Sequence, residues 1–125
     1  MTSRKNILII DDEAPYRVFL RKLFEREGFE VETSASGLVS LDIAARHVPD
    51  VVIVDWMLKN SMDGLQVAAE LRKRNPEVKT ILITGYPSSD LEQQAAGQPQ
   101  TTYIAKPFES QDILAAVIRA LSQSE

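Results

Sequence analysis

Carboxylates, a hydroxyl and an ammonium stand directly after short apolar runs in this sequence. They belong to Asp11, Asp12, Asp55, Thr84 and Lys106. A short apolar run is typical of a strand that is buried on both faces of a parallel sheet. The carboxyl ends of parallel strands lie at the same edge of an open α/β sheet, and ligands bind at that edge. The sequence therefore predicts that these five side chains meet at one edge of a sheet.

A cluster of three carboxylates needs a compensating cation, because like charges raise one another's pKa values. Oxygen ligands favour a hard divalent ion, so we predict Mg²⁺, or Mn²⁺ in its place. Lys106 would add a compact positive charge. An ionised Asp55 beside these cations is suited to attack phosphorus and form an aspartyl phosphate, while Thr84 donates its hydroxyl to a phosphoryl oxygen. Each signal alone is weak, since an isolated aspartate after a strand more often serves a turn, but the ordered set is specific.

Strands and helices are expected to alternate along the whole chain. Pro15 is suited to the first turn of a helix and Gly28 to its end. The predicted strands span residues 6–10, 29–33, 51–55, 80–84 and 101–105. The predicted helices span about 15–27, 38–47, 65–74 and 87–96, and a last apolar stripe covers 113–121. This alternation predicts an α/β fold, a five-stranded parallel sheet with five helices divided between its two faces in three layers.

The buried faces of these helices follow from their apolar spacing. In the second helix the residues expected to face the core are Leu38, Leu41, Ala44, Ala45 and Val48. In the third they are Leu65, Ala68 and Leu71. Glu13 is expected to serve as an acid at the start of the first helix, with contact to a metal-bound water as the alternative.

Composition limits the classes of protein to which this chain can belong. Its 125 residues suit one domain with a single substantial core. A net charge of −4 and the lack of a Lys/Arg block argue against direct nucleic-acid binding by this domain. The sequence contains no cysteine, so no disulfide or thiolate chemistry is available. No long apolar stretch predicts a signal peptide or a membrane span, and a cytoplasmic location is expected.

The ordered strand-end residues resemble the receiver domain of two-component response regulators. The pattern is an acid pair at the first strand end, Asp55 at the third, a threonine at the fourth and Lys106-Pro107 at the fifth. The resemblance extends from Ile7 to Leu121 and implies a single receiver domain over residues 1–125. It also implies the flavodoxin-like strand order 2-1-3-4-5. A member of this family would be a phosphoacceptor and not an enzyme, with at most slow phosphotransfer to itself and slow autodephosphorylation.

The resemblance also implies how such a domain works. Asp55 would take a phosphoryl group from a histidine kinase or a histidine phosphotransfer protein, and Lys106 would bind the phosphate. Thr84 would be the switch hydroxyl and Tyr103 the switch aromatic, which turns inward and changes the surface formed by the fourth helix, fifth strand and fifth helix. This surface would control a downstream protein or an output domain, with the receiver as a monomer or a phosphorylation-dependent dimer. The bond before Pro107 is implied to be cis.

The implied metal ligands are Asp12 directly, Asp11 through a water, Asp55, and the backbone carbonyl of Met57. This sequence departs from the family pattern just after the acceptor, because Gly64 stands nine residues beyond Asp55 and not eight. The intervening loop is therefore expected to follow a different path. The segment 98–100, Gln-Pro-Gln, replaces the usual small residues and predicts an unusual turn before the fifth strand.

Two positions bear on the lifetime of an acyl phosphate. Met57 lies two residues after Asp55, and Tyr86 lies two residues after Thr84. Neither side chain is an acid or amide suited to orient an attacking water, and a bulky pair would shield the phosphate. Slow autodephosphorylation is therefore predicted.

Two other functions remain open from the sequence, and a third is disfavoured. The chain could be a receiver from a longer DNA-binding regulator or a hybrid kinase. It could be an Mg²⁺-dependent phosphatase with an aspartate nucleophile, although Met57 stands where such enzymes carry a second acid. A nucleotide- or flavin-binding module is disfavoured, because no glycine follows the first strand to cradle a phosphate.

Overall fold

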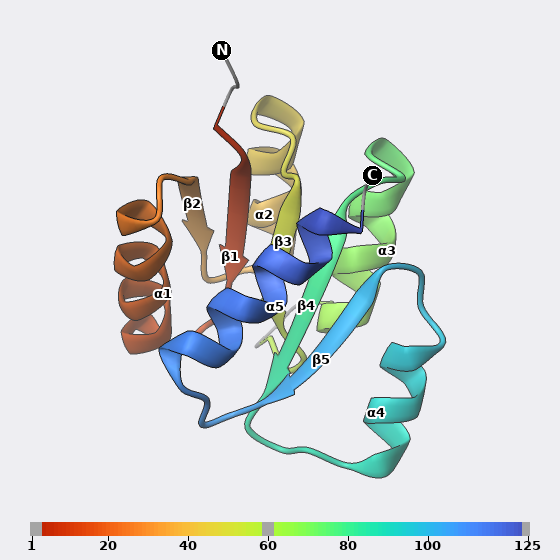
Figure 1. Ribbon diagram of the computed structural model, residues 1–125. Coiled ribbons are helices and arrows are strands. Elements are labelled where there is room, and N and C mark those ends of the chain that lie inside the picture. Colours follow the sequence, from red (N-terminus) through yellow and green to blue (C-terminus); the bar gives the residue numbers. More distant parts are fainter. Residues whose placement is uncertain (1–3, 59–61, 124–125) are drawn as a thin grey trace.

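Strands and helices alternate along the chain in the computed structural model, which describes residues 4–58 and 62–123 (Figure 1). The strands are β1 (Asn6–Ile10), β2 (Glu30–Ser34), β3 (Val51–Asp55), β4 (Lys79–Thr84) and β5 (Thr101–Ala105). The helices are α1 (Ala14–Arg26), α2 (Gly37–Arg46), α3 (Gly64–Arg74), α4 (Ser89–Ala96) and α5 (Ser110–Ser122). All five predicted strands and five predicted helices are present, with ends shifted by at most three residues.

The five strands are parallel and lie in the order β2-β1-β3-β4-β5, which confirms the implied order. In this register Asp55 at the end of β3 lies opposite Ile83 of β4. Thr84, which ends β4, lies opposite Ala105 of β5. Residues just beyond the strands therefore gather at one edge of the sheet, the lower edge in Figure 1.

Helices cover both faces of the sheet, as predicted (Figure 1). Ile7 and Ile9 of β1 belong to the core with α1 and α5, whereas Leu8 and Ile10 belong to the core with α2, α3 and α4. Successive strand residues point to opposite faces, so a strand that is covered on both sides must be apolar throughout. No helix within residues 4–58 and 62–123 is long and apolar enough to cross a membrane.

The start of α3 is fixed against the end of β3. Asp63 and Gln66 form a capping box, in which each side chain accepts a hydrogen bond from the other residue's backbone N–H at 2.9 Å. A Cβ atom on Gly64 would lie 2.5 Å from the backbone oxygen of Asp55, so only glycine permits this approach. The loop that was predicted to take a different path includes residues 59–61, which lie outside the described residues.

The predicted inner face of α2 is partly wrong. Ala44 is buried and Leu41 packs against the core, but Leu38 is 61% exposed and Val48 is 49% exposed. Ala45 is exposed as well. The buried face is formed instead by Gly37, Ser40 and Ala44. A short helix that buries only one narrow strip accepts small residues there, so large apolar residues do not identify the strip.

The turn before β5 is unusual, as predicted. Gln100 has a φ of 55°, which is rare for a residue other than glycine. Its side chain accepts a hydrogen bond from the buried Lys79 ammonium and donates to the carbonyl of Pro76 at 2.8 Å. Arg72 donates to the side chain of Gln98 at 2.8 Å. The two glutamines therefore tie this turn to α3 and to the start of β4.

Candidate functional site

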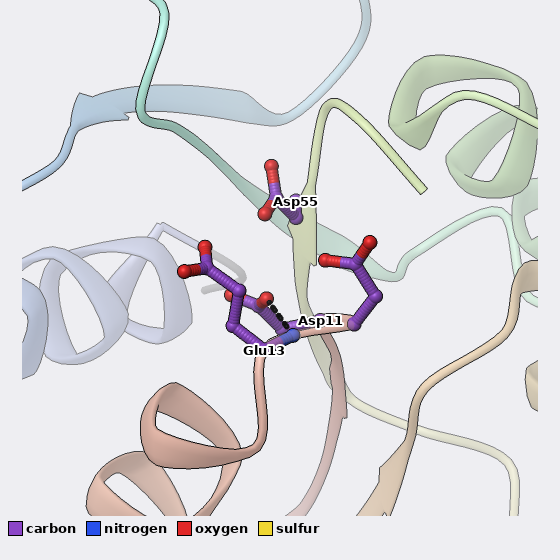
Figure 2. Close-up of side chains that lie close together, drawn as sticks. Asp11, Glu13 and Asp55 are labelled. Carbon is purple, nitrogen blue, oxygen red and sulfur yellow. Dashed lines mark hydrogen bonds between the residues drawn. The ribbon is translucent and has the colours of Figure 1, made fainter. Parts of the chain in front are cut away.

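Four carboxylates meet at the carboxyl edge of the sheet. Asp11 and Asp12 follow β1, Glu13 precedes α1, and Asp55 ends β3. One oxygen from each of the four lies within 4.8 Å of the others. Figure 2 shows Asp11, Glu13 and Asp55 close together, with the backbone N–H of Glu13 donating to Asp11 Oδ1 at 2.8 Å. Two loops that are far apart in the sequence thus form one acidic cluster.

Lys106, directly after β5, is the cation in this cluster. Its Nζ donates hydrogen bonds to Asp55 Oδ2 and to Glu13 Oε2, each at 2.9 Å. It also lies 2.9 Å from Asp11 Oδ2, an ion pair without the alignment of a hydrogen bond. The ring centroid of Tyr16 is 4.0 Å from the same nitrogen, within the range of a cation–π contact. Burial would lower the pKa of Lys106, but its contacts with the carboxylates of Glu13, Asp55 and Asp11 raise the pKa above its ordinary value.

Asp11 is fully buried, and this burial raises its pKa from 3.8 to about 6. The negative charge of Asp55 acts in the same direction, whereas the hydrogen bond from Glu13 N–H and the Lys106 ammonium oppose the rise. The Lys106 ammonium therefore does not fully offset the burial of Asp11 and the charge of Asp55. Such an acidic edge favours a second cation.

Because the pKa of Asp11 is raised, we expect replacement of this residue to stabilise the folded protein, by an amount that depends on pH. Between its ordinary pKa of 3.8 and its folded value of about 6, the folded chain binds a proton that the unfolded chain does not. The contribution of this carboxyl to the free energy of unfolding is therefore fully present below about pH 3.8 and is lost as the pH rises through about 6. We expect Asp11→Asn to raise the free energy of unfolding at pH 7.5 in EDTA, by up to about 3 kcal/mol.

Urea denaturation of the wild type and Asp11→Asn at pH 7.5 and pH 4 checks this prediction. The difference between the two proteins should shrink toward pH 4, because the Asp11 carboxyl is then protonated in the folded state and close to half protonated in the unfolded state. A variant less stable than the wild type at pH 7.5 would contradict it.

The donor set fits a hard divalent cation. All four clustered groups are carboxylates, and Mg²⁺ binds through one or two such groups and keeps several waters. The buried Asp11 Oδ2 forms an ion pair with Lys106 but has no hydrogen-bond partner among the described residues. It can therefore still accept a hydrogen bond from a metal-bound water. Met57 N–H donates to Asp55 Oδ1 at 3.2 Å, which places Met57 beside the acceptor. The role of its carbonyl as a ligand stays a prediction.

The predicted switch residues lie on β4 and β5. Thr84 is fully buried, and its Oγ1 accepts a hydrogen bond from Tyr86 N–H at 3.0 Å. Tyr103 packs against the core of α2, α3 and α4, and its buried hydroxyl has no partner within residues 4–58 and 62–123. This side chain is therefore already turned inward in the structure. The Lys106–Pro107 peptide bond is cis, the isomer that the resemblance implies.

A cleft of about 490 Å³ opens beside Asp55. Met57 and Tyr86 line it together with Asp12 and Glu13. Met57 is 53% exposed and Tyr86 is 73% exposed, so both side chains stand at the mouth of the cleft and not in its floor. The two predicted lifetime positions thus lie on the approach to Asp55.

The sequence analysis missed two parts of this site. Glu13 precedes α1 as expected, but its side chain makes no capping hydrogen bond among the described residues and pairs with Lys106 instead. The ring of Tyr16 also contacts Lys106, a contact that was not predicted. Both contacts join residues about ninety positions apart, so no local pattern could reveal them.

A flavodoxin-like parallel sheet with an acidic cluster at its carboxyl edge and a lysine after its fifth strand is the arrangement of receiver domains. The family model described as "Response regulator receiver domain" matches residues 7–118. The chain belongs to the response regulator receiver family, the signalling domains of two-component systems, which confirms the resemblance.

Similar proteins include both short and long members of this family. Sporulation initiation phosphotransferase F of Bacillus subtilis is 32% identical over 117 residues, covering 94% of each chain. The regulatory protein AtoC of Escherichia coli is 33% identical over 97% of this chain, which spans only 26% of AtoC. A receiver domain protein of Clostridium thermocellum has a TM-score of 0.86 at 30% identity, with 96% of each chain covered. NtrX of Brucella abortus has a TM-score of 0.89 at 28% identity, and the match covers 28% of that chain.

Proposed function

We propose that this chain is a single phosphoacceptor domain that receives a phosphoryl group on Asp55. The donor would be a phosphohistidine on a histidine kinase or a histidine phosphotransfer protein, in the cytoplasm. The observation that carries the proposal is the arrangement of Asp55, which ends β3 beside two further aspartates and accepts a hydrogen bond from Lys106 at 2.9 Å. Membership of the receiver family supports it.

The chemistry follows from the groups around Asp55. A carboxylate oxygen of Asp55 forms the new P–O bond as the P–N bond of the donor breaks, and the donor imidazole, protonated on its other nitrogen, leaves as neutral histidine. Lys106 and the Thr84 hydroxyl would donate hydrogen bonds to phosphoryl oxygens. Asp11, Asp12, Asp55 and the Met57 carbonyl would hold Mg²⁺. When bound, Mg²⁺ supplies positive charge that stabilises the phosphoryl oxygens.

Output would pass through the face formed by α4, β5 and α5. The Thr84 oxygen accepts a hydrogen bond from the Tyr86 N–H, and its proton would be donated to a phosphoryl oxygen. Movement of Thr84 toward the phosphoryl group would therefore shift the backbone at Tyr86, which leads into α4. Charge-assisted hydrogen bonds contribute roughly 1.5–3 kcal/mol each, enough for one or two to shift a two-state equilibrium about tenfold or more. Control of a partner protein or of an output domain is in keeping with relatives that are either short or several times longer.

The experiment that tests this function uses a small phosphodonor such as acetyl phosphate. With Mg²⁺ present, the protein should gain one phosphoryl group that hydroxylamine removes, and peptide mapping should place it on Asp55. Omitting Mg²⁺ should prevent the gain. A phosphoryl group on a residue outside the cleft would reject the proposal. Turnover of a small phosphate ester in the same assay would favour the phosphatase alternative.

The acyl phosphate, once formed, is predicted to be lost slowly. Met57 and Tyr86 flank the cleft with bulky side chains that do not act as a base toward water. We expect Met57→Asn to accelerate loss roughly tenfold or more, because an amide can orient an attacking water. Tyr86→Phe keeps the bulk and is the matched control, with a rate near that of the wild type. Loss of label from the wild type within seconds would contradict the prediction.

A further inference from the structure

The ammonium of Lys106 is enclosed by acceptors. A lysine ammonium has three donors and no acceptor capacity. Carboxylate oxygens of Asp11, Glu13 and Asp55 each lie 2.9 Å from it, and the side chain of Lys106 is only 5% exposed. The Tyr16 ring lies against the same group, 4.0 Å from Nζ. Because three carboxylates and the Tyr16 ring surround the ammonium, a phosphoryl oxygen can reach it only by displacing one of these groups.

The three carboxylates differ in how easily they can leave Lys106. The side chain of Asp11 is 0% exposed, and its other oxygen already accepts from the backbone N–H of Glu13. Asp55 is the phosphoryl acceptor itself and stays next to the lysine. The Glu13 side chain is 57% exposed, so water can solvate its carboxylate when the contact breaks. Breaking the Glu13 contact therefore costs the least free energy of the three, because it leaves no unpaired carboxylate buried.

We propose that Glu13 is a positioning residue that competes with the phosphoryl group for Lys106. In the unphosphorylated protein Glu13 accepts a hydrogen bond from the Lys106 ammonium beside Asp55. When Asp55 is phosphorylated, this hydrogen bond breaks and Lys106 donates to a phosphoryl oxygen instead. This inference rests on the proposed function and adds a regulatory element to the same site. It also explains why the Glu13 side chain crosses to Lys106 and leaves the start of α1 without a side-chain cap among the described residues.

The proposal predicts effects of opposite sign on a cation and an anion. The negative charge of Glu13 attracts a divalent cation in the carboxylate cluster but repels a phosphoryl group. Glu13→Gln should therefore weaken Mg²⁺ binding and strengthen the binding of a phosphoryl analogue. Damage to the fold of the site would weaken both, and a purely solvated Glu13 would leave both unchanged. Opposite signs thus separate competition for Lys106 from a structural role.

The test measures two dissociation constants through the fluorescence of Trp56, the only tryptophan, which adjoins Asp55. The first titration uses Mg²⁺ alone. The second uses beryllium fluoride, a tetrahedral phosphoryl analogue, at Mg²⁺ concentrations that saturate each variant. For Glu13→Gln we expect the Mg²⁺ constant to rise roughly threefold to tenfold, and the beryllium fluoride constant to fall roughly twofold to fivefold.

Two further variants sharpen the result. Glu27→Gln removes the same charge at the far end of α1, from an exposed position, and should change neither constant. Glu13→Asp keeps the charge but shortens the reach toward Lys106. It should bind Mg²⁺ nearly as the wild type does and bind beryllium fluoride more tightly than the wild type. Urea midpoints near the wild-type value would verify that each variant is folded.

The contrary outcomes are distinct. If Glu13→Gln shifts both constants in the same direction, or shifts neither, Glu13 does not compete for Lys106. If Mg²⁺ affinity falls by more than about a hundredfold, Glu13 is a metal ligand and the inference is wrong. If the wild type itself binds neither Mg²⁺ nor beryllium fluoride, the proposed function fails first.

Discussion

Replacement of Asp55 by asparagine is expected to abolish acyl-phosphate formation. The amide of asparagine is nearly the same size as the carboxylate, and Asp55 is only 5% exposed, so the side chain should keep its place at the end of β3. What is lost is the ionised oxygen that must form the bond to phosphorus. Mass spectrometry after treatment with acetyl phosphate and Mg²⁺ should detect a phosphoryl group on the wild type and none on Asp55→Asn.

A second acid in the same cleft provides the matched control. Asp63 lines the cleft but caps α3, and among the described residues it forms no ion pair with Lys106. Asparagine is as good a helix cap as aspartate, so Asp63→Asn should fold normally. Its phosphoryl incorporation should match that of the wild type. Undiminished incorporation in Asp55→Asn would show that another residue is the acceptor.

Gly64→Ala is expected to have the largest effect on the fold of the site. The added Cβ would lie 2.5 Å from the backbone oxygen of Asp55 and 2.9 Å from Cδ1 of Leu82. Leu82 can rotate, but the Asp55 carbonyl belongs to the central strand, so either α3 or the end of β3 must move. Overpacking of this kind costs roughly 1–3 kcal/mol, and more where backbone is displaced. Urea denaturation should report this loss.

The shift should also reach the chemistry, because the displaced backbone carries the Asp55 carboxylate. We expect weaker Mg²⁺ binding by Trp56 fluorescence and slower phosphoryl incorporation in Gly64→Ala. Gly97→Ala is the control: there a Cβ would meet its nearest atoms at 3.6 and 3.7 Å, ordinary contact distances. Its stability should change by less than about 0.5 kcal/mol. Equal stability of the two variants would contradict the steric argument.

Much of this site could be predicted because its residues lie at the ends of strands. A strand that is buried on both faces leaves a continuous apolar run, and the first polar residue after it marks the functional edge. Asp11, Asp55, Thr84 and Lys106 all stand at such positions, so the sequence alone predicts that they lie together. The strand order came from the family resemblance, since parallel strands with similar apolar runs carry no local signal of their neighbours.

Two expectations depended on information that the local sequence does not contain. The orientation of α2 was wrong for Leu38 and Val48, because a rotation of one residue turns a helix by about a hundred degrees and a short apolar helix offers several similar faces. The contact between Glu13 and Lys106 joins residues 93 positions apart, and it depends on how α1 enters the sheet edge. Such contacts follow from tertiary geometry alone.

The same long separations have a consequence for folding order. Lys106 lies 51 residues beyond Asp55 and 93 beyond Glu13, and it follows the last strand. During synthesis the acidic cluster therefore emerges well before the cation that offsets it. A nascent chain that ends before β5 must hold these carboxylates without Lys106, and bound divalent cations would be its available substitute. We expect Mg²⁺ to accelerate refolding of the domain, most strongly at low ionic strength where unscreened repulsion is greatest.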